Sequence, residues 1–361
     1  MLIPGVLLLC LTAAQTQTVI HTQTLSMPLA ERWREAMTKG ENTGGKFFVG
    51  YSIGRLMNED TYFSCGTTFR GNVRTHTTLY ELIEGKPRPS QSVKAAARSA
   101  LARARGIEGF TVMKDVAILA GYTPSRGLTD AAVVTMDLGY DFGGAQLYWL
   151  GAGTPEEHAG LVSSLFDKAT TTDAKENVVA AAGMGNASDA SFSFLSGVLT
   201  GTGHNDVREK AAFWIGEQAD PRALQLLLQT ATEDRSGDVR EHAVFAISRI
   251  PTDNAVEALI SLGRSARDRD VREKAVFWLG QTASAKAVAE LDTIVHSNAD
   301  SDIQRRAVWA IASMEDGGID RLISIATTHR NPSVRKAAIM ALGNSDDPRA
   351  FDTLVKIVRK R

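Results

Sequence analysis

The sequence has little cysteine. Only Cys10 and Cys65 occur among its 361 residues. Two cysteines form at most one disulfide, which excludes a disulfide-stapled scaffold, and they cannot provide a four-cysteine metal site. If the N-terminal segment is removed, Cys65 remains alone. A single cysteine in an exported protein is usually a small buried hydrophobic residue, and a reactive or intermolecular role is the alternative.

An excess of either charge is also missing. The chain has 40 basic and 41 acidic residues and a net charge of −1. This balance argues against a dedicated binder of nucleic acid or of a membrane surface. Hydrophobic residues make up 43% of the chain, which is enough for a core and excludes disorder by composition. The length allows two domains or one extended repeat array.

Long hydrophobic runs are absent, and the longest candidate, Leu2–Leu11, is too short to span a bilayer. Small residues follow it at 12–14, so residues 1–14 resemble a secretory signal peptide that is cleaved after about Ala14. We therefore expect a periplasmic or secreted protein that does not span the membrane. No Lys or Arg precedes the run, which leaves a misassigned start or a short buried strand as alternatives. A lipoprotein anchor at Cys10 is disfavoured because the bulky Leu9 precedes it.

The usual catalytic motifs are missing as well. The sequence has no G-x-S-x-G, no P-loop and no G-x-G-x-x-G before a helix. Its seven histidines are scattered without the spacing of metal ligands. We therefore predict no catalytic residue, no metal site and no cofactor.

What the sequence does contain is one string written three times. It reads DVREKAAFWIG at 206–216, DVREHAVFAIS at 238–248 and DVREKAVFWLG at 270–280. Related strings give units that start at Asp173, Asp206, Asp238, Asp270, Asp302 and Ser333, in steps of 31 to 33 residues. A fixed period of this length is typical of a solenoid, in which each unit packs only on its neighbours.

Each unit is predicted to form a helix, a turn and a second helix. The first residue suits an N-cap, and Glu three residues later, as in Glu209 and Glu273, suits a capping box. Apolar or small residues one, five and nine positions after the cap lie on one helical stripe. The next residue is small in every unit, which allows a turn or the close approach of a neighbouring helix. A second apolar segment follows, for example at 223–228 and 255–260.

The string Asp-Val-Arg-x-x-Ala-x-x-x-Leu/Ile-Gly resembles HEAT repeats, in the short bacterial form called PBS-lyase HEAT-like. The resemblance covers a little over half of the chain. It implies a mainly α fold, with a right-handed α-solenoid of about six helix–turn–helix repeats within 154–361. It is specific for the fold but not for function. Deoxyhypusine hydroxylase, a di-iron enzyme of this type, has repeated His-Glu pairs. Here the matching positions read Glu209-Lys210, Glu241-His242, Glu273-Lys274 and Arg305-Arg306, so no iron site is implied.

Residues 15–153 are predicted to form a small α+β domain. A helix is expected at 26–40, capped by Ser26 and stopped by Gly40. A second helix is expected at 92–105, and strands at 45–53, 115–120 and 131–136.

The end of this predicted domain has two notable segments. Segments 133–138 and 145–150 flank Gly143-Gly144 and favour a β-hairpin, with a further helical unit from Asp141 as the alternative. Thr154-Pro155-Glu156-Glu157 predicts the start of a helix in either case, because it supplies a cap, a first-position Pro and first-turn acids.

Basic residues recur two positions after each unit start. They include Arg208, Arg240, Arg272 and Arg335. In a solenoid they would form a ladder with steps of about 10 Å. We favour an inter-repeat role, since Asp accompanies Arg in most units. The alternative is a stripe that binds an acidic partner.

Aromatic residues form a second row, Phe213, Phe245, Phe277 and Trp309, with Trp214 and Trp278 beside two of them. Adjacent residues of a helix cannot share one face, so Trp214 and Trp278 are candidate anchors for a partner. We therefore interpret the chain as a non-catalytic scaffold or adaptor of the bacterial cell envelope that binds a protein and no nucleic acid. The alternative is an enzyme or regulator whose site lies in residues 41–150 or in a cleft between domains.

Overall fold

A computed structural model describes residues 18–22, 25–58, 61–66, 77–85, 111–218, 220–282, 285–297, 300–314 and 318–359. The predicted signal peptide at 1–14 and the predicted helix at 92–105 lie outside these residues. The chain divides into two compact units between Ala181 and Ala182. The predicted domain boundary, between 153 and 154, lies between the last strand of unit 1 and the helix after it, and it stays a prediction.

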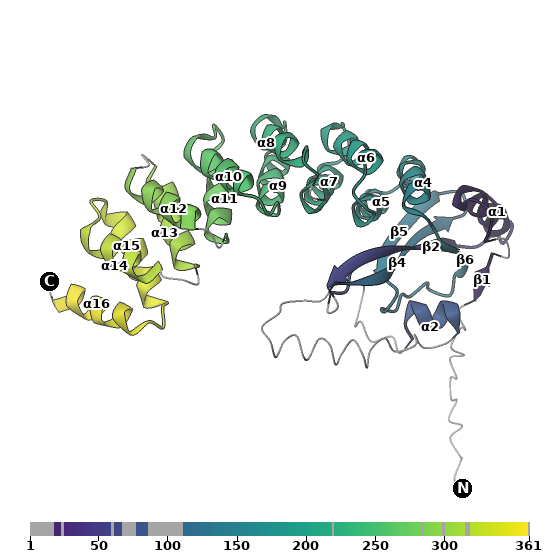
Figure 1. Ribbon diagram of the computed structural model, residues 1–361, viewed down its shortest axis with the longest axis horizontal. Coiled ribbons are helices and arrows are strands. Elements are labelled where there is room, and N and C mark those ends of the chain that lie inside the picture. The colour runs from purple at the N-terminus through teal and green to yellow at the C-terminus, as the bar shows by residue number, and fades with distance from the viewer. Residues whose placement is uncertain are drawn as a thin grey trace, which may run out of the picture. The chain divides into compact units, whose positions relative to one another are not determined.

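The described part of unit 1 contains a mixed sheet of six strands (Figure 1). The strands are β1 (Val19–His21), β2 (Phe47–Asn58), β3 (Ser64–Gly66), β4 (Thr111–Thr123), β5 (Gly127–Thr135) and β6 (Gln146–Ala152). Their order in the sheet is β1-β6-β2-β4-β5-β3. β6 pairs in parallel with β1 and β2, and the other pairs are antiparallel.

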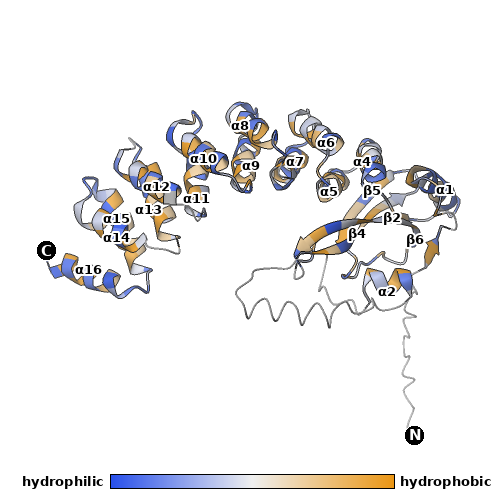
Figure 2. Ribbon diagram, viewed as in Figure 1, coloured by the Kyte–Doolittle hydropathy of each residue, from blue (hydrophilic) through white to orange (hydrophobic). Residues whose placement is uncertain are grey.

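Residues 47–53 of β2 are all buried. Since successive side chains of a strand point to opposite faces, both faces of the sheet are covered there. Helices α1 (Leu29–Glu41) and α4 (Pro155–Lys168) cover the face of Tyr51, which contacts Trp33 edge to face and His158 by a hydrogen bond. Helix α2 (Leu79–Glu84) covers the face of Phe48. Figure 2 shows the resulting run of hydrophobic residues along β4 and β5.

The strand prediction for residues 145–150 is correct, but the hairpin is wrong. β6 lies between β1 and β2, whereas β5 lies between β4 and β3. Gly143 and Gly144 do turn the chain with positive φ angles of 61° and 77°. Tyr140 and Phe142, however, pack on Phe48 in the core with ring centroids 5.9 and 5.2 Å away. Burying these two rings leads the chain across the sheet, so β5 and β6 do not pair.

The helix ends of unit 1 match the sequence in one case and not in another. α4 begins as predicted, with Thr154 as N-cap, a complete capping box to Glu157 and Pro at the first turn. α1 starts after Pro28 without a side-chain cap, so Ser26 is not its cap. Gly40 is not a stop either, because it lies inside α1. A Cβ there would stand 2.3 Å from the Phe47 ring, so glycine is needed for close packing.

The helices that follow come in pairs. They are α5 (Thr172–Met184), α6 (Asp189–Thr200), α7 (Asn205–Glu217), α8 (Ala223–Glu233), α9 (Gly237–Ser248), α10 (Asp253–Ser265), α11 (Arg269–Gly280), α12 (Ala285–Ser297), α13 (Ser301–Ala312), α14 (Gly318–Thr328), α15 (Pro332–Gly343) and α16 (Pro348–Arg359). Within unit 2, α7, α9, α11, α13 and α15 pack on one another in chain order and form one row, which we call the odd row (Figure 1). This is the α-solenoid that the repeats predict.

The apolar stripe of each unit lies in the core, as predicted. The residues one, five and nine positions after the unit starts are at most 2% exposed in all five complete repeats of the odd row. They are Val207, Ala211, Ile215, Val239, Ala243, Ile247, Val271, Ala275, Leu279, Ile303, Ala307, Ile311, Val334, Ala338 and Leu342. The alignment of the repeats in the sequence therefore matches the positions that pack in the core.

The predicted caps are wrong by two residues. The N-caps of the odd row are His204, Ser236, Asp268, Asp300 and Asn331, and all but Ser236 accept the N–H two positions later. The repeated Asp is the second residue of its helix, where a carboxylate still favours the positive end of the helix dipole. The Glu residues, as shown below, serve as ion-pair partners and not in capping boxes.

The small residue after each stripe permits close helix packing. A Cβ on Gly216 would stand 2.5 Å from the Ala246 carbonyl oxygen, and one on Gly280 would stand 2.7 Å from the Ala310 Cβ. Gly343, in the last described repeat, has nothing within 4 Å of that position.

Gly280→Ala and Gly343→Ala should therefore have opposite effects. We expect Gly280→Ala to lower the free energy of unfolding by about 1–3 kcal/mol, because backbone atoms of α13 must move. Gly343→Ala should be neutral or stabilise by up to about 1 kcal/mol, since alanine favours helix and meets no neighbour. Urea unfolding followed by circular dichroism measures both. Equal losses in the two variants would show that the repeats are packed in a different register.

Candidate functional site

The odd row carries a line of ion pairs between successive repeats. A basic side chain of one repeat meets the glutamate of the repeat before. His242 Nδ1 lies 3.3 Å from Glu209, Lys274 Nζ lies 3.2 Å from Glu241, and Arg306 pairs with Glu273. Burial raises the pKa of Glu209, and the nearby His242 opposes this shift. Within the described residues, no group of three or more His, Cys, Asp or Glu side chains is placed to hold a metal ion.

Arg208 is the most buried member of the arginine ladder, at 1% exposure. Its Nε donates to the carbonyl of Leu199, at the end of α6, over 2.8 Å. Its terminal nitrogen pairs with Asp234, just before α9, whose side chain is 10% exposed. This one side chain therefore links three consecutive segments of the solenoid.

The other ladder residues repeat part of this pattern. Arg240 donates to the Asp234 carbonyl over 2.6 Å and pairs with the cap residue Asp268. Arg272 donates to the Ala266 carbonyl over 2.6 Å, and Arg335 to the His329 carbonyl over 2.7 Å. Each accepted carbonyl follows the end of a helix, where a cation is favoured by the helix dipole. These contacts connect the end of one helix pair to the first helix of the next.

The Arg240 contact also affects the acid that it meets. Partial burial raises the pKa of Asp268, but the hydrogen bond from Arg240 and the backbone N–H of Asp270 outweigh it and lower the pKa. Asp268 serves at once as helix cap and as ion-pair partner.

The aromatic rings of successive repeats stack on one another, but the position that supplies the ring changes along the solenoid. Phe213 stacks on Phe245, with ring centroids 6.0 Å apart. The next ring on Phe245 is Trp278, at 4.7 Å, and not Phe277. Phe277 then meets Trp278 edge to face at 5.0 Å and is 48% exposed.

The two candidate anchors differ because their neighbours differ. Trp214 is only 5% exposed, and its ring lies where a side chain on Gly183 would be, 2.1 Å from the position of a Cβ. Ser248 occupies the place of Gly183 in the repeat before Trp278, and its hydroxyl donates to the Phe245 carbonyl over 2.6 Å. Trp278 is half-buried on Phe245. Trp214 therefore offers a partner almost no surface, and Phe277 is exposed instead.

Three exposed apolar side chains follow one another in the odd row. Phe277 on α11, Trp309 on α13 and Met340 on α15 are 48%, 40% and 53% exposed. They are at equivalent repeat positions, 32 and 31 residues apart, and we call them the exposed strip. Large apolar residues at one place in three successive repeats form a surface suited to protein recognition. Phe277 and Trp309 belong to the aromatic row visible in the sequence, whereas Met340 is not aromatic and was missed.

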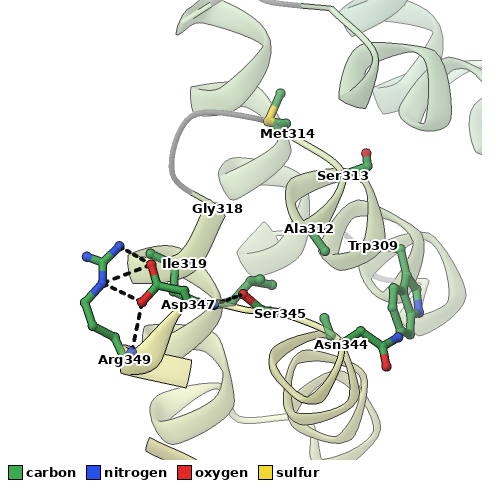
Figure 3. A pocket seen from close by; sticks show the side chains of 12 residues that line it. Trp309, Ala312, Ser313, Met314, Gly318, Ile319, Asn344, Ser345, Asp347 and Arg349 are labelled. Carbon is green, nitrogen blue, oxygen red and sulfur yellow. Dashed lines mark hydrogen bonds and ion pairs between the residues drawn. The ribbon is translucent and has the colours of Figure 1, made fainter. Parts of the chain in front are cut away.

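Trp309 also lines a pocket of about 640 Å³ between the last two described repeats (Figure 3). The apolar wall includes Ile319 and Leu322. The polar wall includes Arg349, whose hydrogen bonds lower the pKa of Asp347. This pocket gives the exposed strip a concave neighbour.

Cys65 is the remaining residue that the sequence singled out. Cys65 lies on the edge strand β3, half-buried and opposite Val133. None of the helices in the described ranges is long and apolar enough to cross a membrane.

Comparison with known proteins agrees with the repeat geometry. The family model described as HEAT repeats matches residues 192–280 and 290–361. These segments are HEAT repeats. The HEAT repeats contain the arginine ladder and the exposed strip. No curated protein matches the chain significantly.

Several solved structures match parts of the chain at low similarity. A phycocyanin lyase complex from Nostoc sp. PCC7120 has 20% identity and a TM-score of 0.32, covering 43% of this chain and 99% of the other. Human deoxyhypusine hydroxylase with glycerol has 20% identity and a TM-score of 0.25, covering 56% and 78%. A condensin subcomplex of S. pombe has 14% identity and a TM-score of 0.26, covering 57% and 34%. At this similarity their activities say nothing about this chain.

Proposed function

We propose that the protein is a non-catalytic scaffold or adaptor of the bacterial cell envelope, which binds a protein partner through the exposed strip of its HEAT repeats. The observation that carries this proposal is the repetition of exposure: Phe277, Trp309 and Met340 leave the core at the same place in three successive repeats. Keeping such side chains in water is unfavourable, so a partner that covers them gains apolar burial.

The other conspicuous polar rows of the solenoid are already engaged in structure. The arginine ladder donates to helix ends and to Asp234 or Asp268, and the glutamate row forms ion pairs between repeats. The glutamate row stands four residues before the aromatic row that includes Phe277, on the same side of the helices. This supports the exposed strip, and not the arginine ladder, as the partner-binding surface.

A double variant tests the binding surface. We expect Phe277→Ser with Trp309→Ser to reduce crosslinked capture of the partner from envelope fractions by at least about tenfold, a loss of at least about 1.4 kcal/mol in binding. The matched control is Phe351→Ser with Val358→Ser on α16, since these residues are 69% and 73% exposed and lie outside the exposed strip. Folding is checked by circular dichroism. Equal capture by both variants would place the partner elsewhere on the protein.

The envelope location rests on the apolar run at 2–11 and the small residues after it. We expect N-terminal sequencing of the mature protein to begin near Gln15. Retention of Met1 on protein recovered from the cytosol would contradict export.

A further inference from the structure

We propose that the partner segment on the exposed strip is acidic and extended, in the polyproline II conformation, with an apolar side chain at every third residue. This inference rests on the proposed function and specifies the chemistry that the same surface recognises. Three features of the odd row carry it: the charge on one edge of the exposed strip, the neutrality of the other edge, and the distance between successive anchors.

Cations occupy the edge that lies one helical turn before the exposed strip. Lys274, Arg305, Arg306 and Lys336 stand three or four residues before a strip residue. At that spacing, side chains lie on the same side of a helix. The side chains of Lys274, Arg305 and Arg306 are 47%, 41% and 56% exposed, and Lys336 is exposed as well.

The acidic residues near this edge are already ion-paired in the repeats that precede α15. Glu241 pairs with Lys274, Glu273 with Arg306, and Asp302 with Arg305. Helix α15 contains Arg335 and Lys336 and no acidic residue. Among the described residues, Lys336 makes no ion pair or hydrogen bond through its side chain. A carboxylate on the partner therefore finds an exposed ammonium group at this end of the exposed strip.

The residues one helical turn after the exposed strip are uncharged. Gln281, Ser313 and Asn344 follow the three strip residues by four positions, and all three are exposed. The Gln281 amide donates to the Ser313 hydroxyl over 3.3 Å. Amide and hydroxyl groups can bond the backbone of a bound segment, and a polyproline II chain keeps all its carbonyls free for such bonds. The two edges thus select acidic side chains on one side of the segment only.

The spacing of the anchors selects the conformation. Helices of a packed row are about 8–10 Å apart. A polyproline II chain presents the same side every three residues, or about 9.3 Å. A β-strand repeats a face every two residues, or about 6.6 Å, which does not match.

An α-helix repeats a face about every seven residues, or about 10.5 Å, but its apolar stripe is broad. The exposed strip is one residue wide in each repeat, with polar residues on both edges. Aromatic surfaces of this kind suit polyproline II segments.

Synthetic peptides test the inference on the full chain by fluorescence anisotropy. The probe is a labelled peptide of four Leu-Pro-Glu triplets, and the charge-reversed control has four Leu-Pro-Lys triplets. A third peptide places the same leucines and glutamates in helical heptads. We expect the Leu-Pro-Glu peptide to bind at least about tenfold more tightly than either control, and more weakly as salt rises, because the contacts are charged and exposed.

Charge variants identify the edge. Lys336→Glu should weaken binding of the Leu-Pro-Glu peptide by about tenfold, whereas Lys356→Glu, on α16 outside the exposed strip, should leave it unchanged. Tighter binding of the lysine peptide or of the heptad peptide overturns the inference. So does the absence of peptide binding while partner capture still depends on Phe277 and Trp309, an outcome that leaves the proposed function intact. Capture that is independent of those two residues contradicts the proposed function itself.

Discussion

Replacing Arg208 by alanine should lower the free energy of unfolding of the solenoid by about 3–5 kcal/mol. The variant leaves the Asp234 carboxylate, which is 10% exposed, without the cation that it meets. It also removes the donor to the Leu199 carbonyl. An uncompensated buried charge is among the most destabilising changes that a single substitution can make.

Arg272→Ala is the matched control, because it is the same substitution at the same repeat position. Arg272 is half-buried and donates to the Ala266 and Arg267 carbonyls over 2.6 and 3.2 Å. We expect a loss of about 1 kcal/mol, the usual contribution of such hydrogen bonds. Urea unfolding of both variants gives the comparison. If Arg208→Ala unfolds like the unmodified protein, the ladder is not a structural element, and it becomes a candidate binding stripe.

Unit 1 should lose stability as the pH falls from about 6.5 to about 4. Burial lowers the pKa of His158 to about 4, against the donor bond to the Ala181 carbonyl, which raises it. His158 therefore becomes protonated near pH 6.5 in the unfolded chain but only near pH 4 in the folded chain. The stabilisation is complete above pH 6.5 and is lost on acidification, by up to about 3 kcal/mol. Hydrogen exchange of the β2 and α4 amides at several pH values measures the loss.

Two variants separate burial from hydrogen bonding as its cause. His158→Gln should abolish the loss between pH 6.5 and 4, because glutamine does not titrate. Tyr51→Phe removes the hydroxyl that lies 2.7 Å from His158 Nδ1. It should keep the pH dependence, since burial sets the pKa. A pH dependence that survives in His158→Gln would assign the effect to another group, such as Glu157, whose pKa is lowered by the backbone N–H groups of Thr154 and Leu29.

The fold of the repeats could be predicted from the sequence because the apolar pattern that packs each helix recurs at the same positions in every unit. Val271, Ala275 and Leu279 lie on one helical stripe, and the same stripe recurs in every unit. The caps were misplaced because Asp and Glu suit several first-turn positions. A usable signal was present, since a residue able to accept an N–H, such as Asp268 or Asn331, stands two positions before each unit start.

Details that depend on contacts distant in sequence could not be predicted. The strand at Gln146–Ala152 was visible in its residues, but its partners β1 and β2 are selected by the burial of Tyr140 and Phe142. The Phe-Trp pair is the same in two repeats, yet only Phe277 is exposed. The equivalent residue of the preceding repeat is Gly183 for Trp214 and Ser248 for Trp278. The sequence therefore identified Phe277 and Trp309 as members of one row, but the structure was needed to show that they are exposed and to add Met340.

The most direct test of the central claim is site-specific photocrosslinking from the odd row. A photoreactive residue at Met340, which is 53% exposed in the exposed strip, is compared with one at Phe351, which is 69% exposed on α16. Partner binding through the exposed strip predicts a protein adduct from position 340 and little or none from position 351. Adducts of equal yield from both positions, or from position 351 alone, would contradict the claim that these HEAT repeats bind their partner through the exposed strip.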